Sequence, residues 1–378
     1  MPTPRTLRQV LWLLAGLVAF VAGAIALVPH GHTSPSAAGT TQPLVDSTTT
    51  ATVPQTATLP TSSHVEGSSQ SSLITSSQPA PTAPIAAAAS STTNAVGSEP
   101  PSAASSRPGE GRWHPFASTR SGPVLWATTV HPLAKQPDVI ATYALFNPAR
   151  VHAALFNGTV LPGGGPWNNG ARVMPAAQPA LLGAFNGGFL FKHIKGGYFT
   201  ESRVVKPLID GDATLAIGVD GRIVLGKYGR DLTNDGSWVS MRQNLPPVID
   251  GGRQAVTTAT EQGSPFIYWG DDYGHVTLDR RSAICRRADG LLTYIVTERV
   301  DITGLANVLL AAQCDFAMEL DINGSWPQFV SFTPSASGPP TAIGLTPTMT
   351  HLNRVITGST KDFIALFDPT LLAPHVTR

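Results

Sequence analysis

Residues 314–325 read Cys314-Asp315-Phe316-Ala317-Met318-Glu319-Leu320-Asp321-Ile322-Asn323-Gly324-Ser325, a short apolar run that ends in two carboxylates and a polar turn. The run predicts a buried strand, in which successive side chains point to opposite faces. Glu319 and Asp321 are therefore expected on one face, at the carboxyl end of the strand. Two ionisable side chains in that position suit polar binding or acid/base chemistry better than core packing, so this stretch is the first candidate functional site.

The chain before this stretch predicts a helix over residues 303–313. Thr303 is a suitable N-cap, and apolar residues recur at the spacing of one helical face, at Leu305, Val308, Leu309 and Ala312. The helix leads from a strand that ends near residue 297 to the strand at 316–320. That order is typical of a right-handed βαβ crossover.

Short β-rich runs separated by Gly, Pro, Asn and Asp predict strands in the rest of the domain. They lie at residues 124–130, 139–146, 151–156, 181–185, 214–219, 222–225, 281–286, 291–297, 328–332, 353–357 and 362–367. Asp220-Gly221 and Asp289-Gly290 each separate two of these runs, and such dipeptides favour tight antiparallel hairpins. The sequence therefore predicts an α/β domain, with α+β as the alternative, built on a mixed, largely antiparallel sheet with few helices.

The N-terminus carries an uninterrupted apolar run at residues 10–28, long enough to cross a bilayer core of roughly 30 Å. Arg5 and Arg8 precede it and no Lys or Arg follows until Arg107, so the positive-inside rule places residues 1–9 in the cytoplasm. We therefore expect a signal anchor in a single-pass protein of the cell membrane, with the C-terminal domain outside the cytoplasm. Cleavage of a signal peptide, which would make the protein secreted, is the alternative.

Residues 29–111 are dominated by Ser, Thr, Pro and Ala. They offer too few large apolar side chains to offset the entropy of ordering, so a disordered linker is expected. Residues 112–378 have a mixed composition and sufficient length for one large domain. Arg outnumbers Lys, and Ala and Pro are abundant, which indicates a bacterium with a GC-rich genome.

The composition argues against several classes of function. The 378 residues carry 25 basic and 24 acidic side chains, so a net charge of +1 gives no electrostatic basis for binding nucleic acid. Neither a serine-hydrolase elbow nor a P-loop motif is present, and no cofactor is predicted. Residues 231–236 resemble the start of a calcium loop, but Arg242 occupies its twelfth position, so no metal site is predicted. The two cysteines, Cys285 and Cys314, are either a disulfide or two buried small side chains.

Three further clusters place polar groups at the ends of predicted strands. Asn186 offers a donor and an acceptor, and Gly187 and Gly188 permit either a tight turn or the close approach of a ligand. Asp250 ends a strand-like run before two glycines, a pattern that by itself indicates a turn. Arg281 opens a buried strand with a guanidinium group suited to bidentate phosphate binding, and surface solvation is the alternative.

Taken together and in order, these clusters resemble the phosphodiester glycosidase family. The matching motifs are Asn-Gly-Gly-Phe at 186–189, a strand ending in Asp-Gly at 249–251, Arg-Ser-Ala at 281–283, Leu-Asp followed by Gly-Ser within 320–325, and a terminal strand at 362–366. The resemblance covers about residues 180–367. Ile322 and Asn323 replace two glycines of the family pattern, and Glu319 stands where Asn is common.

The resemblance implies hydrolysis of a sugar 1-phosphodiester in envelope or extracellular glycans, with release of the free sugar and a phosphomonoester. It implies that Asp321 forms the carboxylate pair for glycoside cleavage with Glu319 or Asp250. Arg281 would hold the phosphate, and Asn186 would bind sugar hydroxyls. The substrate-binding residues expected from the matching motifs are Asn186, Gly187, Gly188, Arg281, Asn323, Gly324 and Ser325.

Two alternatives stay open. A catalytically silent module that binds glycan or a partner protein through the same cleft fits the altered glycine loop, and Trp326 and Phe329 are suited to stack on sugar rings. The other alternative is structural: Asp321 and Asn323 cap a turn, and Glu319 pairs with an arginine.

Overall fold

A computed structural model describes residues 99–256, 269, 278–322, 324–373 and 376, all within one compact unit that spans Thr82–Arg378. The predicted cytoplasmic segment 1–9, the predicted anchor 10–28, the linker up to residue 98 and Asn323 lie outside the described residues. No helix among the described residues is long and apolar enough to cross a membrane. The predicted single-pass location in the cell membrane is therefore not borne out by the part of the chain that the structure describes.

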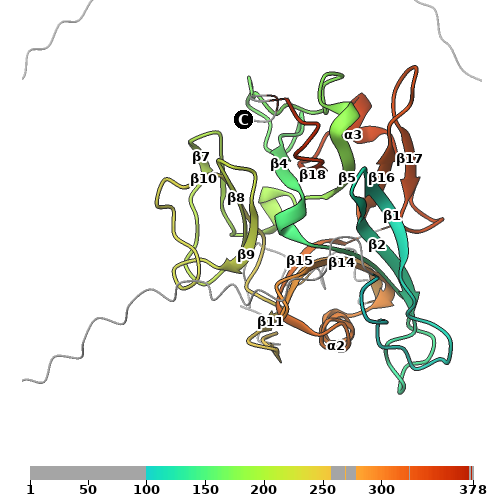
Figure 1. The fold of residues 1–378 in the computed structure, drawn as a ribbon. Coiled ribbons are helices and arrows are strands. Elements are labelled where there is room, and N and C mark those ends of the chain that lie inside the picture. The colour runs from blue at the N-terminus through green and yellow to red at the C-terminus, as the bar shows by residue number, and fades with distance from the viewer. Residues whose placement is uncertain (1–98, 257–268, 270–277, 323, 374–375, 377–378) are drawn as a thin grey trace, which may run out of the picture. The chain divides into compact units, whose positions relative to one another are not determined.

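The described chain forms three sheets (Figure 1). In order across the sheet, the first contains β1 (His114–Thr119), β2 (Gly122–Val130), β3 (Ala141–Phe146), β14 (Leu292–Val300), β13 (Asp279–Arg287), β15 (Cys314–Ile322), β11 (Ile249–Asp250) and β12 (Arg253–Gln254). The second contains β7 (Arg203–Lys206), β6 (Tyr198–Thr200), β10 (Trp238–Gln243), β8 (Ala213–Gly218) and β9 (Ile223–Lys227). The third contains β17 (Thr341–Gly344), β16 (Phe329–Thr333), β5 (Leu181–Asn186), β18 (Phe363–Phe367) and β4 (His152–Phe156). The helices are α2 (Ile302–Ala311), α3 (Arg354–Thr357) and three 3₁₀ turns at Pro148–Arg150, Gln178–Ala180 and Phe191–His193.

The α/β prediction is wrong, because the described domain is mostly β. Every pair of neighbouring strands in the three sheets is antiparallel. Helix α2 does connect β14 to β15, but β13 lies between these two strands and pairs with both. One strong helical pattern is therefore not representative of the fold. The tight turns that join neighbouring antiparallel strands represent the fold better.

The hairpin predictions are confirmed. Asp220-Gly221 joins β8 to β9, and Asp289-Gly290 joins β13 to β14, each as an antiparallel pair. Both glycines have a φ of 81°, in the left-handed region that favours glycine.

Two other local predictions need correction. Residues 353–357, predicted as a strand, contain the helical turn α3, in which Gly358 N donates to Arg354 O at 2.7 Å. Three β-branched side chains, Val355, Ile356 and Thr357, give this turn a strand-like composition. Helix α2 is capped by Asp301, whose side chain accepts from Gly304 N at 2.6 Å, and not by Thr303.

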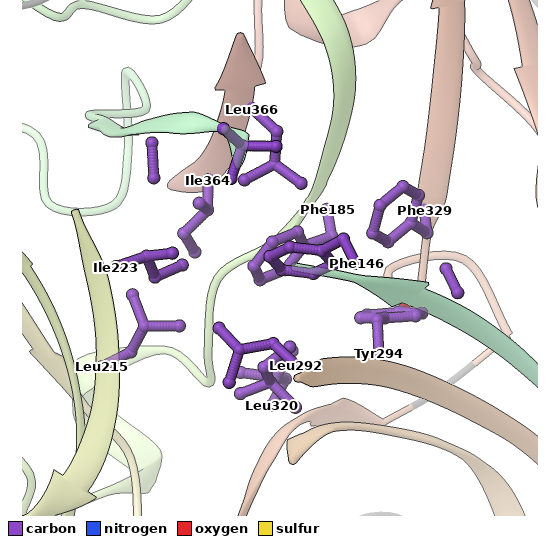
Figure 2. Packing of buried hydrophobic residues seen from close by; sticks show 14 of the residues in the cluster. Phe146, Phe185, Leu215, Ile223, Leu292, Tyr294, Leu320, Phe329, Ile364 and Leu366 are labelled. Carbon is purple, nitrogen blue, oxygen red and sulfur yellow. The ribbon is translucent and has the colours of Figure 1, made fainter. Parts of the chain in front are cut away.

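All three sheets contribute to one apolar core (Figure 2). The labelled members are Phe146, Tyr294, Leu292 and Leu320 from the first sheet, Leu215 and Ile223 from the second, and Phe185, Phe329, Ile364 and Leu366 from the third. Leu320 lies in sequence between Glu319 and Asp321. Full burial of a leucine side chain is worth roughly 1.5–3 kcal/mol, so the core anchors β15 at the candidate site.

Two further contacts fix the first sheet. Cys285 of β13 and Cys314 of β15 form a disulfide with their Cα atoms 5.6 Å apart, which resolves the alternative that the sequence left open. Part of the predicted linker, residues 99–111, packs on the domain: Ser106 N donates to His131 O at 2.8 Å.

Candidate active site

The ladder between β13 and β15 slips by one residue at the candidate site. Ala283 lies opposite Glu319, but Arg281 lies opposite Ile322, so β15 carries one extra residue in a β-bulge. The Ser282 hydroxyl fills the gap, since it accepts from Asp321 N at 3.2 Å and donates to Asp321 O at 2.9 Å. Bulges redirect side chains next to functional sites. Strict alternation therefore does not hold here, and the two carboxylates meet different partners.

Glu319 forms a buried ion pair with Arg281. Its Oε1 lies 2.7 Å from Arg281 Nη1, and both side chains are 0% exposed. Arg281 also donates to Val300 O at 2.9 Å and to Trp269 O at 2.5 Å. The part of the structural alternative in which Glu319 pairs with an arginine is confirmed. Because Arg281 has no exposed surface, the geometry gives no support to its predicted role in phosphate binding.

The side-chain amide of Asn186 contacts the bulge through Ser282. Its Nδ2 donates to Gly187 O at 3.0 Å and to Ser282 Oγ at 3.2 Å, and its Oδ1 accepts from Tyr294 Oη at 2.8 Å and from Gln328 N at 3.0 Å. These bonds use both donors and both acceptor lone pairs of the side-chain amide. The amide is thus fully engaged within the protein. Its contact with Ser282 makes Asn186 a positioning residue, and the predicted contact with sugar hydroxyls has no support.

Gly187 and Gly188 leave room for two polar side chains. A Cβ on Gly187 would lie 2.1 Å from Asp362 Oδ2, and a Cβ on Gly188 would lie 1.8 Å from Asn244 Oδ1. Asp362 forms a buried ion pair with Arg242 at 2.8 Å, and Asn244 donates to two consecutive carbonyl oxygens of β15 at 2.8 and 2.9 Å. The glycine pair is therefore required by close packing beneath the site.

Asp321 has a different environment. It is 3% exposed, and its Oδ2 forms an ion pair with Lys361 Nζ. Burial raises the pKa of Asp321 to about 6, and the charge of Lys361 opposes that rise. A carboxyl group with such a pKa exchanges protons near neutral pH, as a general acid or base requires.

A pocket of about 520 Å³ adjoins this pair. Its lining includes Ser325, Trp326, His351, Asn353, Arg354 and Ser359. Lys361 connects Asp321 to the pocket, because its Nζ lies 4.8 Å from the centroid of the Trp326 ring. Arg354 Cζ lies 4.6 Å from the same centroid. Arg354 and Trp326 thus line the pocket. Lys361, which is not part of the lining, lies against the same tryptophan and pairs with the titratable carboxyl group of Asp321.

The loop after β15 contacts its neighbours through backbone oxygens. Gly324 O accepts from Arg280 Nη1 at 3.4 Å, and Ser325 O accepts from Arg354 Nη2 at 3.0 Å. Arg280 also pairs with Glu298 at 3.1 Å. Of the predicted loop residues, Ser325 therefore lines the pocket, Gly324 lies beside Arg280, and Asn323 lies outside the described residues.

Asp250 lies apart from Asp321. It accepts from Arg230 at 2.8 and 2.9 Å and from Lys227 at 3.4 Å. The hydrogen bonds from Arg230 are the main reason that the pKa of Asp250 is lowered. Asp250 pairs with Phe316 on β15, so it is displaced from Asp321 by five positions, or roughly 17 Å at about 3.3 Å per residue. The predicted carboxylate pair of Asp250 with Asp321 is therefore not assembled.

The sequence patterns did not identify Lys361 and Arg354. Both lie far along the chain from Asp321, and Arg354 belongs to the helical turn that was predicted as a strand. The available signal was weak: Lys361 is one of few lysines and directly precedes the predicted terminal strand. Among the described residues, no three His, Cys, Asp or Glu side chains converge to hold a metal ion.

No family model matches the chain, and no curated protein matches it. Among solved structures, the chain is similar to the catalytic domain of zebrafish N-acetylglucosamine-1-phosphodiester alpha-N-acetylglucosaminidase, auto-inhibited by its pro-peptide. The two share 17% identity with a TM-score of 0.41, and the match covers 68% of this chain and 87% of that one. It is also similar to a hypothetical protein from Synechocystis at 11% identity and a TM-score of 0.39, covering 66% of this chain and 63% of that one. This similarity is a distant one of fold, and it assigns neither residue roles nor a substrate to this chain.

Proposed function

We propose that the domain hydrolyses a sugar 1-phosphodiester in the pocket beside Asp321. The observation that carries the proposal is the titratable carboxyl group of Asp321, whose pKa is raised to about 6. It is held by Lys361, which contacts Trp326 of a pocket that Arg354 also lines. Trp326 supplies an aromatic face on which a sugar ring can stack. The order of the matching sequence motifs supports the same reaction class.

The charge balance of the pocket favours a phosphorylated leaving group. Glycosidases that expel an alcohol use two carboxyl groups, one of which protonates the departing oxygen. Here Glu319 is buried against Arg281, and Asp250 lies in a partly exposed ion cluster. The described pocket lining contains no carboxylate, so Asp321 beside it has no second carboxyl group as a partner. A phosphomonoester leaves as a stabilised anion, so cations can replace the acid.

The proposed reaction needs one proton acceptor. Water attacks the anomeric carbon, and ionised Asp321 takes a proton from it as general base. The bond between that carbon and the phosphoryl oxygen breaks, and the phosphomonoester leaves with the bonding electrons. The products are the free sugar and the phosphomonoester.

The test is hydrolysis of a panel of sugar 1-phosphodiesters by the full chain, with both products quantified. Asp321→Asn should reduce kcat by about 10²–10⁴-fold, because the substitution removes the base. Asp315→Asn is the matched control, since Asp315 lies on the same strand in a partly exposed pair with Arg286, and should leave kcat unchanged. For the wild type, kcat should rise with pH through about 6 and then level off, as Asp321 ionises.

The same experiment decides against a catalytically silent binding module. Glycan binding without product release from any member of the panel, unaffected by Asp321→Asn, would replace the hydrolase by that alternative. Equal turnover by Asp321→Asn and the wild type would remove Asp321 from the mechanism.

A further inference from the structure

Arg354 is only partly buried, and it differs in its partners from the buried arginines of the site. Arg281 and Arg242 each face a buried carboxylate, Glu319 and Asp362, at 2.7 and 2.8 Å. For Arg354, the described residues supply one backbone acceptor, Ser325 O at 3.0 Å, and no carboxylate within ion-pair distance. Its Nε is buried and has no hydrogen-bond partner among the described residues.

A guanidinium group in this state has unused binding capacity. It carries five N–H donors in a planar fork, and a buried donor without a partner is costly. Burial lowers the pKa of Arg354, and the nearby charge of Asp321 acts in the opposite direction. Because the side chain is only partly buried and lines the pocket, an anion there would accept from its Nη groups and restore the balance of charge.

The arginine is also held in place. Its bond to Ser325 O and its position over the Trp326 ring, 4.6 Å from the centroid, restrict the side chain at the pocket wall. Lys361 lies 4.8 Å from the same centroid, so the two cations face a single carboxylate, Asp321. The net charge of this group of three is positive, which suits an anionic ligand.

We propose that Arg354, restrained by Trp326 and Ser325, binds the phosphoryl group of the substrate, the role that the sequence resemblance implied for Arg281. This inference rests on the proposed function for the identity of the phosphoryl group. Arg354 would hold two non-bridging oxygens and stabilise the leaving phosphomonoester, while Asp321 acts at the sugar carbon.

The test is binding of inorganic phosphate to the full chain at low ionic strength, measured by calorimetric titration, with no turnover involved. Arg354→Gln should weaken phosphate binding by about tenfold or more, because a charge-assisted bidentate contact is lost. Arg354→Lys should give an intermediate loss, since lysine keeps the charge without the planar fork. The matched control is Arg203→Gln: Arg203 also stacks on a tryptophan, with Cζ 3.6 Å from the Trp167 centroid, but it does not line the pocket.

Each result decides the proposal separately from the proposed reaction. Phosphate affinity that is unchanged in Arg354→Gln, reduced equally in Arg203→Gln, or not measurable in the wild type overturns the assignment of Arg354. Arg354→Lys, which retains the length and charge of the side chain, answers the same question should Arg354→Gln fail to fold. Phosphate binding that depends on Arg354 in a protein with no hydrolytic activity would support the subsite while the reaction fails.

Discussion

Glu319 and Asp321 lie two positions apart on β15, and each pairs with a buried cation, yet their surroundings differ. Glu319 faces Arg281, whose guanidinium also donates to two backbone carbonyl oxygens, and neither side chain of the pair has any exposure. Asp321 faces the single amine of Lys361 next to a pocket, and its pKa is raised to about 6. The comparison teaches that burial of a charged pair does not mark a functional site. A neighbouring pocket and a pKa near neutrality are the better grounds for a candidate site.

The largest expected loss of stability comes from breaking the buried ion pair of Glu319 with Arg281. Glu319→Gln leaves the charge of Arg281 buried and uncompensated, so the free energy of unfolding should fall by about 3–5 kcal/mol. Urea denaturation measures the loss. Asp315→Asn is the control on the same strand, because Asp315 pairs with Arg286 at 2.9 Å with both side chains about one-third exposed, and it should cost about 0–1 kcal/mol. Similar losses in both variants would contradict the distinction between a sealed and an exposed pair.

The next largest effect concerns the disulfide that joins β13 to β15. Replacing Cys285 and Cys314 by Ser removes the only disulfide and should lower the free energy of unfolding by about 2–4 kcal/mol, since it joins positions separated by 29 residues. Phosphate binding should persist, because Arg354 and Trp326 belong to segments outside this ladder. Loss of phosphate binding in a variant that stays folded would show that the two sides of β15 are coupled.

Local chemistry explains which parts of the fold could be predicted. The turns at Asp220-Gly221 and Asp289-Gly290 are specified by two adjacent residues, so both hairpins were found. The arrangement of three sheets around a shared core depends on residues far apart in the sequence, such as Leu215 and Phe329, packing into one cluster, which no local pattern encodes. The turn α3 was missed because four residues of helix with β-branched side chains carry little periodicity.

The site follows the same division. Asp321 was predicted from its position at a strand end. Its cation, Lys361, arrives from a segment before β18, so the pairing is a property of the tertiary structure. The roles expected of Asn186 and Arg281 lack geometric support for a different reason. Both residues lie at the bulge, but hydrogen bonds within the protein already use their polar groups. Whether the polar groups of a side chain are already hydrogen-bonded depends on neighbours that the sequence does not identify.

A smaller effect tests the raised pKa of Asp321 through the pH dependence of stability. The ordinary pKa of an aspartate side chain is 3.8, and that of Asp321 in the folded protein is about 6, so the folded state binds the proton more tightly. Its contribution to stability is therefore complete below pH 3.8 and is lost as pH rises through about 6, on the order of 2–3 kcal/mol in total. The charged groups that act on it are Lys361, Asp362 and Arg354. The stability difference between the wild type and Asp321→Asn, which cannot titrate, should fall across this interval, and a constant difference would contradict a raised pKa.

The smallest expected effect belongs to Asp250, the carboxylate that the sequence offered as a partner for Asp321. Asp250→Asn removes ion pairs with Arg230 and Lys227 in which the side chains of Arg230, Lys227 and Asp250 are 51%, 32% and 19% exposed, so stability should change by about 0–1 kcal/mol. Because Asp250 lies opposite Phe316 and away from the pocket, kcat and phosphate affinity should equal those of the wild type. Lys227→Met removes a cation of the same cluster and serves as the control for surface charge. A fall in kcat of tenfold or more in Asp250→Asn alone, which corresponds to about 1.4 kcal/mol, would restore Asp250 to the mechanism and require a second carboxylate at the reacting carbon.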